Sequence, residues 1–208
     1  DCGHPSDVGR ARVAGDQPLD QLAAEERRDV RVAGEGVERD AQARARIGRA
    51  LAEDLVSRGW RVAALGRDVD RLAELAAAAP PDQVLPLVAD VTDSTAMAQA
   101  VAALHALWRT PDLVVANAGS LTAIGPTWEV DPDQWWHDME VNVRGVFTTM
   151  RDVVPAMVER GSGRVIVMSS GMGRFPSPWT SAYGASKAAA SHLVSSLAAE
   201  LAGTGVSV

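Results

Sequence analysis

The chain has 208 residues, of which 47% are hydrophobic and 23% charged, a composition typical of a globular protein with room for one domain and a sizeable core. A net charge of -7 argues against binding of nucleic acid through phosphate neutralisation. The single cysteine, Cys2, argues against an internal disulfide, and the four histidines lack the spacing of metal ligands. No apolar run approaches the roughly 20 residues that cross a membrane, so we expect a cytoplasmic protein without a metal site.

The first 46 residues differ in composition from the rest of the chain. They contain no aromatic residue, 18 of them are charged, and no helical or strand period persists. We therefore expect residues 1–46 to be loosely packed or disordered, outside a single domain that covers residues 47–208. The local signals within this segment predict at most a short helix from Leu19 to Arg28 and a short strand that includes Val30, Val32 and Val37.

From Ile47 onward, short apolar runs alternate with stretches of helical periodicity. Asp68 is placed to cap one helix, and a proline pair, Pro80-Pro81, ends it. An asparagine and a glycine, Asn142 and Gly145, weaken a long helical stretch and predict a local distortion. The expected strands are 60–65, 84–89, 112–116 and 164–168, with another that begins at 206, and the expected helices cover 47–58, 69–79, 94–108, 133–159 and 181–202.

This alternation predicts crossover units and a doubly wound parallel sheet between two layers of helices. The strands are apolar at successive positions, as in sheets that are covered on both faces. In such sheets, ligands bind beyond the carboxyl ends of the strands. Four loops follow strands and are expected at that edge: Gly66-Arg67, Asp90-Val91, Asn117-Ala118-Gly119 and Ser169-Ser170.

The only tyrosine and the only lysine of the chain lie four residues apart, at Tyr183 and Lys187. All other basic residues are arginine, so this lysine is expected where a compact ammonium is required. Four residues is one helical turn, which puts both side chains on the same face of the last predicted helix. An ammonium beside a phenol favours the phenolate and yields an acid/base that can work near neutral pH. A half-buried tyrosine and a surface lysine remain the alternative interpretation.

Asparagine and serine residues supply the other polar candidates. Asn117 and Asn142 are the only asparagines, and Asn117 directly follows a strand, where it could also be a turn or a helix cap. Ser170 could begin a turn, or it could offer its hydroxyl to a substrate oxygen at the same edge of the sheet. Because no Gly-X-Ser-X-Gly elbow surrounds Ser170, a hydrolase nucleophile is not expected.

These residues occur in the order and spacing of the short-chain dehydrogenase/reductase family, which residues 47–208 resemble. The resemblance implies a Rossmann-like fold, here incomplete at both ends. It also implies an NAD(P)-dependent oxidoreductase that interconverts an alcohol and a carbonyl by hydride transfer. The segments that carry it are Asp90-Val91, Asn117-Ala118-Gly119, Asn142, Ser169-Ser170 and Tyr183-X-X-X-Lys187.

The resemblance implies a role for each catalytic candidate. Tyr183 would be the general acid/base, and Lys187 would favour its phenolate and hydrogen-bond the nicotinamide ribose. Ser170 would orient the substrate carbonyl, and Asn142 would hold a water in a proton relay behind Lys187. The substrate would be a small-molecule alcohol or ketone, and the family's pairing of helices between subunits implies a homodimer or homotetramer.

The resemblance also implies NADP rather than NAD as the cofactor. Arg67 follows the second strand of the family pattern, where it would pair with a 2′-phosphate, and no acidic residue ends that strand to bind a free 2′-hydroxyl. Besides Tyr183 and Lys187, the implied cofactor contacts are Gly48, Arg67, Asp90, Val91, Asn117, Ala118 and Gly119.

Two departures from the family pattern leave other interpretations open. The family's glycine-rich turn aligns with Ala41, Gln42, Arg46 and Gly48, of which only the last is glycine. The family also continues beyond Val208. We therefore hypothesise that residues 1–46 are not the native start, through a shifted reading frame or a mis-assigned gene start. The alternative functions are a catalytically silent family member or gene fragment that binds no dinucleotide, and a dehydratase or epimerase that uses the same tyrosine and lysine.

Overall fold

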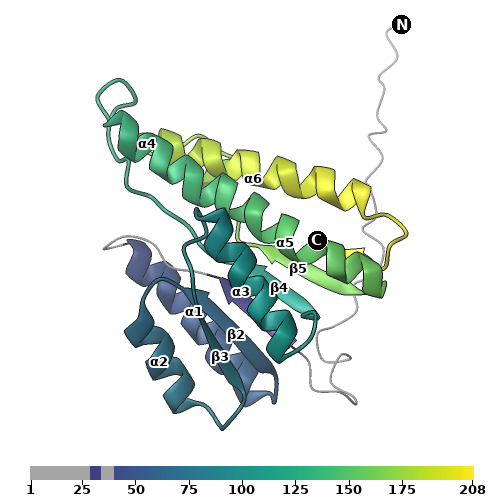
Figure 1. Ribbon diagram of the computed structural model, residues 1–208. Helices are drawn as coiled ribbons and strands as arrows, with labels where there is room; N and C mark the ends of the chain where they lie inside the picture. Colours follow the sequence, from purple (N-terminus) through teal and green to yellow (C-terminus); the bar gives the residue numbers. More distant parts are fainter. Residues whose placement is uncertain (1–28, 34–39) are drawn as a thin grey trace, which may run out of the picture.

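The protein forms one six-stranded sheet in the order β3-β2-β1-β4-β5-β6, seen here in a computed structural model that describes residues 29–33 and 40–208 (Figure 1). All neighbouring strands pair in parallel, as the alternation of strands and helices predicts. The strands are β1 (Asp29–Ala33), β2 (Arg61–Gly66), β3 (Val84–Val88), β4 (Leu113–Ala116), β5 (Gly163–Val167) and β6 (Val206–Ser207).

The helices connect successive strands. Each of α2, α3 and α4 begins after an aspartate whose carboxylate accepts hydrogen bonds from backbone N–H groups of the first turn. In α2 this residue is Asp68, as predicted. Among the described residues, no helix is long and apolar enough to cross a membrane. The helices are α1 (Asp40–Ser57), α2 (Val69–Ala78), α3 (Ser94–Leu107), α4 (Pro132–Met139), the π-helix η2 (Glu140–Arg144), α5 (Gly145–Arg160), the 3-10 turn η3 (Gly171–Gly173) and α6 (Ser181–Glu200).

Both faces of the sheet are covered, which explains why its strands are apolar at successive positions. On β2, Val62 and Ala64 pack in a cluster with residues of α1 and α2. Ala63 and Leu65 point to the opposite face and pack with residues of α3. On that same face, a third cluster joins β4 and β5 to α5 and α6. The predicted three-layer, doubly wound architecture is confirmed.

Two elements extend into the segment that we expected to be poorly ordered. β1 lies in the middle of the sheet between β2 and β4, so the short strand predicted around Val30 and Val32 is present. Helix α1 begins at Asp40 rather than at Ile47. The predicted boundary at residue 47 therefore falls inside a helix. A five-residue strand has little local signal, and its position follows from pairing with β2 and β4, which are distant in sequence. The predicted helix from Leu19 to Arg28, and Val37, lie outside the described residues.

The long helical stretch predicted over 133–159 consists of three segments, α4, η2 and α5. The interruption is a π-helical turn that contains Asn142, so the predicted distortion is present and its form is a widened turn rather than a break. The next residue after η2 is Gly145, where a Cβ atom would lie 2.7 Å from Cγ2 of Val91. Glycine is required here because the helix approaches the loop after β3 this closely.

Candidate active site

Helix α6 carries Tyr183 and Lys187 on one face, as their spacing predicts. Both are buried, with 8% and 3% of their surface exposed, and the lysine Nζ lies 5.7 Å from the centre of the tyrosine ring. The Lys187 ammonium donates a hydrogen bond of 2.7 Å to the carbonyl oxygen of Met168, directly after β5. A buried ammonium is costly unless it is hydrogen-bonded, so this carbonyl helps to hold it beside the phenol. The alternative of a surface lysine is wrong.

Asn142 connects α6 to the loop after β4. Its amide accepts from the Ser120 backbone N–H at 2.8 Å and donates to the Ser120 carbonyl at 2.8 Å. The same amide nitrogen donates to the Ser186 hydroxyl at 2.9 Å, and that hydroxyl donates to the Tyr183 carbonyl at 2.8 Å. These contacts satisfy a fully buried asparagine, which explains its presence inside a helix. They join Asn142 to the turn of α6 that separates Tyr183 from Lys187.

Ser170 lies at the start of η3, where its hydroxyl accepts from the backbone N–H of Met172 at 3.3 Å. The neighbouring Ser169 instead pairs its hydroxyl with that of Ser191, at 2.9 Å. The turn η3 packs tightly on α6: a Cβ at Gly173 would lie 2.8 Å from the backbone carbon of Lys187. Because only glycine permits this contact, the segment after Ser170 is held against the helix that carries the tyrosine and the lysine.

Asp138 is a site residue that sequence reasoning missed. It is fully buried on α4, and its carboxylate accepts from the Ser120 hydroxyl at 2.5 Å and from the backbone N–H groups of Thr122 and Ala123 at 2.9 and 3.1 Å. The carboxylate therefore fixes the loop that also binds Asn142. The available signal was its position four residues before Asn142, on the same helical face.

The candidates for the adenosine end of a dinucleotide gather at the carboxyl edge of the sheet. Arg67 follows β2 and Asp90 follows β3, and the two form an ion pair of 3.2 Å. Partial burial raises the pKa of Asp90, but hydrogen bonds from Thr92 and the charge of Arg67 outweigh it and hold the pKa below its ordinary value. The other predicted contacts in this region, Val91, Asn117, Ala118 and Gly119, are buried in the loops after β3 and β4.

The predicted phosphate-binding turn is not formed by the residues that align with it. Ala41, Gln42 and Arg46 lie within α1, and Gly48 is buried in the interior of the same helix. A helix binds phosphate at its N-terminus, and that of α1 lies eight residues before Gly48, which corresponds to about 12 Å along the axis. The candidates after β2, β3 and β4 and on α6 thus lie at one edge of the sheet, as a dinucleotide site requires, whereas Gly48 is not placed to contact a pyrophosphate at the N-terminus of α1. The residues between β1 and α1 lie outside the described structure.

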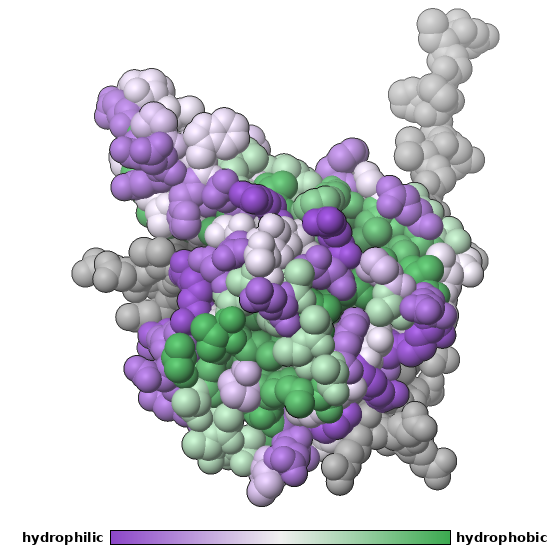
Figure 2. Space-filling model, in the orientation of Figure 1, coloured by the Kyte–Doolittle hydropathy of each residue, from purple (hydrophilic) through white to green (hydrophobic). Residues whose placement is uncertain are grey.

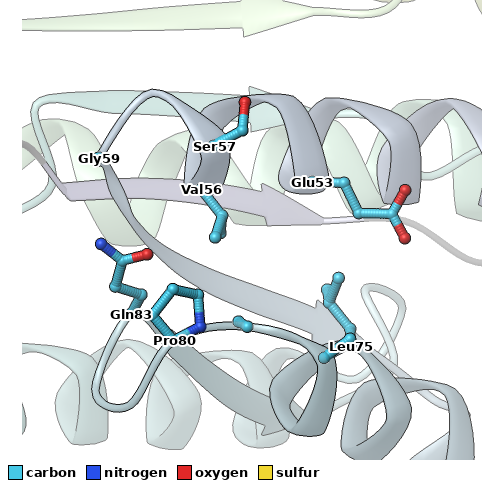
Figure 3. A pocket seen from close by; sticks show the side chains of 9 residues that line it. Glu53, Val56, Ser57, Gly59, Leu75, Pro80 and Gln83 are labelled. Atoms are coloured by element: carbon cyan, nitrogen blue, oxygen red, sulfur yellow. The ribbon is translucent and has the colours of Figure 1, made fainter.

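A pocket of about 480 Å³ lies elsewhere, between the C-terminal ends of α1 and α2 (Figure 3). Val56 and Leu75 project into it from opposite walls, and Gln83 and Gly59, which precede β3 and β2, line one end (Figure 3). This pocket therefore lies near the amino ends of β2 and β3, away from the loops that carry the site. None of the predicted site residues lines it.

The chain belongs to the short-chain dehydrogenase family, whose family model matches residues 43–208. It is 35% identical over 166 residues to a probable NADP-dependent dehydrogenase of Haemophilus influenzae, covering 80% of this chain and 66% of that protein. It is also 35% identical over 160 residues to a 2-dehydro-3-deoxy-L-rhamnonate dehydrogenase (NAD(+)) of a Sphingomonas species, covering 77% of this chain and 64% of that protein.

Solved structures show the same fold. A short-chain dehydrogenase from Streptomyces avermitilis matches with a TM-score of 0.78 at 32% identity, over 89% of this chain and 64% of that one. The chain thus spans about two thirds of the length of the relatives and of the structure that it matches.

Proposed function

We propose that this protein is an oxidoreductase that interconverts a small-molecule alcohol and the corresponding carbonyl compound. The observation that supports it best is the buried pair Tyr183 and Lys187 at the carboxyl edge of the sheet, since burial of an ammonium beside a phenol has a cost that proton transfer explains. Family membership and the dehydrogenases among the relatives support the same reaction class.

In this reaction a bound nicotinamide cofactor supplies the hydride for carbonyl reduction and accepts it in alcohol oxidation. Tyr183 gives the substrate oxygen a proton as the carbonyl carbon gains the hydride, and it takes that proton back in the other direction. The Lys187 ammonium stabilises the phenolate that remains. Ser170 donates a hydrogen bond to the substrate oxygen and so orients the carbonyl. Asn142 is a positioning residue, because its contacts with Ser120 and Ser186 hold the α6 turn in place.

Removal of the Ser170 hydroxyl tests its role. Ser170→Ala is expected to lower kcat/KM for a ketone by about ten- to a hundredfold, because a hydrogen bond that polarises the reacting carbonyl is lost. The matched control is Ser169→Ala, which removes the adjacent hydroxyl and its contact with Ser191. Steady-state kinetics with both variants decide the question, and equal losses in the two would exclude a specific role for Ser170.

NADP is the proposed cofactor, because Arg67 lies at the edge of the sheet where the 2′-phosphate of NADP would be bound, and one relative is named as NADP-dependent. Arg67→Ser is expected to raise the Kd of NADPH about ten- to a hundredfold and to leave that of NADH within about threefold, because a charge-assisted phosphate contact is lost. Calorimetric titration measures both constants.

Arg109→Ser is the matched control for Arg67→Ser. Arg109 is similarly exposed and pairs with Asp112 at 2.9 Å, but it precedes β4 and so lies at the opposite edge of the sheet. A loss of NADPH affinity in both variants would contradict a specific role for Arg67.

The second candidate function is a family member that binds no dinucleotide, which the helical conformation of Ala41, Gln42 and Arg46 favours. Absence of binding at millimolar concentrations of either cofactor would establish that candidate.

A homodimer or homotetramer is the proposed assembly. Phe147 and Val158 on α5 are exposed, and Figure 2 shows apolar patches beside polar ones on one face of the molecule. Light scattering coupled to size-exclusion chromatography is expected to give twice or four times the monomer mass, and a monomer at micromolar concentration would contradict the proposal. A cytoplasmic location stays a prediction.

A further inference from the structure

Two loops meet beside the tyrosine. One spans residues 120–131 after β4, and the other, residues 174–180, connects η3 to α6. The backbone N–H of Gly125 donates a hydrogen bond of 2.9 Å to the carbonyl of Trp179 and so joins the two loops. Trp179 lies four residues before Tyr183, just ahead of the first turn of α6. Its backbone therefore lies next to the first turn of α6, which carries Tyr183.

Trp179 has a backbone conformation that tryptophan rarely adopts. Its φ is +72°, in the left-handed region where glycine is favoured and bulky residues are strained. Among the described residues, the only other non-glycine residue with positive φ is Asp82, whose short polar side chain tolerates this conformation. Burial does not offset the strain at Trp179, because 65% of its surface is exposed. A strained residue whose ring remains in solvent indicates that the ring serves another purpose.

Other apolar side chains of the two loops are exposed as well. Ile124, next to the hydrogen-bonded Gly125, is 61% exposed, and Phe175 is 66% exposed. The nearby charges are directed at aromatic rings: Arg174 lies 5.9 Å from the centre of the Phe175 ring, and Glu129 accepts from the indole N–H of Trp128. The remaining charge, Asp131, caps α4 by accepting from the Gln134 N–H. The two loops thus offer a ligand apolar rings beside only three charges, two negative and one positive.

We infer that Trp179 determines substrate specificity by stacking on a flat, uncharged apolar substituent, so that the preferred substrates are aryl ketones and the matching secondary alcohols. Stacking on an aromatic substrate ring needs an indole that is exposed, as Trp179 is. It also benefits from a restrained backbone, which the hydrogen bond from Gly125 provides. This inference rests on the proposed function and specifies its substrate class.

The test compares Trp179→Gly with wild type on two ketones of different shape, acetophenone and 2-butanone, with NADPH. Glycine accepts φ of +72° without strain, so the variant should fold at least as well as wild type while it lacks the indole. We expect kcat/KM for acetophenone to fall at least tenfold, mainly through KM, and that for 2-butanone to change less than threefold. The control is Asp82→Gly, which relieves the other positive φ at a position distant in sequence from Trp179. It should change kcat/KM for neither ketone.

The outcomes separate this inference from the proposed function. Equal losses for both ketones, or no loss for either, would overturn the role of Trp179 while leaving the reaction intact. If wild type turns over neither ketone, calorimetric titration with NADPH tests the proposed function, and saturation-transfer NMR of acetophenone with each variant tests the binding site directly. A signal in wild type that Trp179→Gly loses would support the inference, and unchanged or absent signals would overturn it.

Discussion

Replacement of Tyr183 by phenylalanine is expected to lower kcat for carbonyl reduction by at least about a hundredfold. The substitution removes one oxygen and leaves the buried ring, so the packing of the ring and its contact with the Lys187 ammonium at 5.7 Å should persist. Only the proton donor is lost, and water is a poor substitute for a positioned phenol of which only 8% is exposed. Steady-state measurement of NADPH oxidation with a ketone checks the prediction.

Two further measurements make the Tyr183→Phe result specific. The Kd of NADPH should stay within about threefold of wild type, and the midpoint of urea unfolding should change little, because a conservative change at this ring alters one polar atom. A variant that retains kcat within threefold of wild type would refute Tyr183 as the acid/base. A variant that loses cofactor binding together with kcat would indicate a structural role instead.

Replacement of Asp138 by leucine is expected to lower the free energy of unfolding by about 3–5 kcal/mol, the largest stability effect that we predict. The carboxylate accepts from Ser120, Thr122 and Ala123, and all of these donors would be left buried without a partner. The loop that binds Asn142 would loosen, so kcat should fall as well. Urea denaturation monitored by circular dichroism measures the stability change.

Asp138→Asn is a more conservative variant of the same position. It keeps the volume of the side chain but places an amide NH2 group against the backbone N–H groups that now donate to the carboxylate. We therefore expect the free energy of unfolding to fall by about half as much as in the leucine variant. Asp133→Asn is the matched control, because Asp133 is an exposed carboxylate on the same helix. Its substitution should cost only a few tenths of a kcal/mol. A similar stability for wild type and Asp138→Leu would show that the carboxylate does not hold the loop.

Much of the candidate site was predictable because its signals are local. Tyr183 and Lys187 lie on one face of α6 because residues one turn apart on a helix must do so. The distortion at Asn142 followed from a residue type that is unfavourable inside a helix. Asp138 was missed, because an aspartate on a helix normally faces solvent and only the loop of Ser120 to Ala123 makes its burial favourable. The roles of Ser170 and Arg67 stay predictions.

The sequence by itself determined which segments are strands and which are helices from residue 60 onward, and that the polar loops after those strands lie at the carboxyl edge of a parallel sheet. These properties depend on side-chain periodicity and on helix caps, which act over a few residues. Tertiary structure alone decided that Asp29–Ala33 is a central strand, that α1 begins at Asp40 and includes the positions of the glycine turn, and that Gly125 is joined to Trp179. Each of these depends on pairing between segments far apart in the chain, whose free energy no local pattern contains.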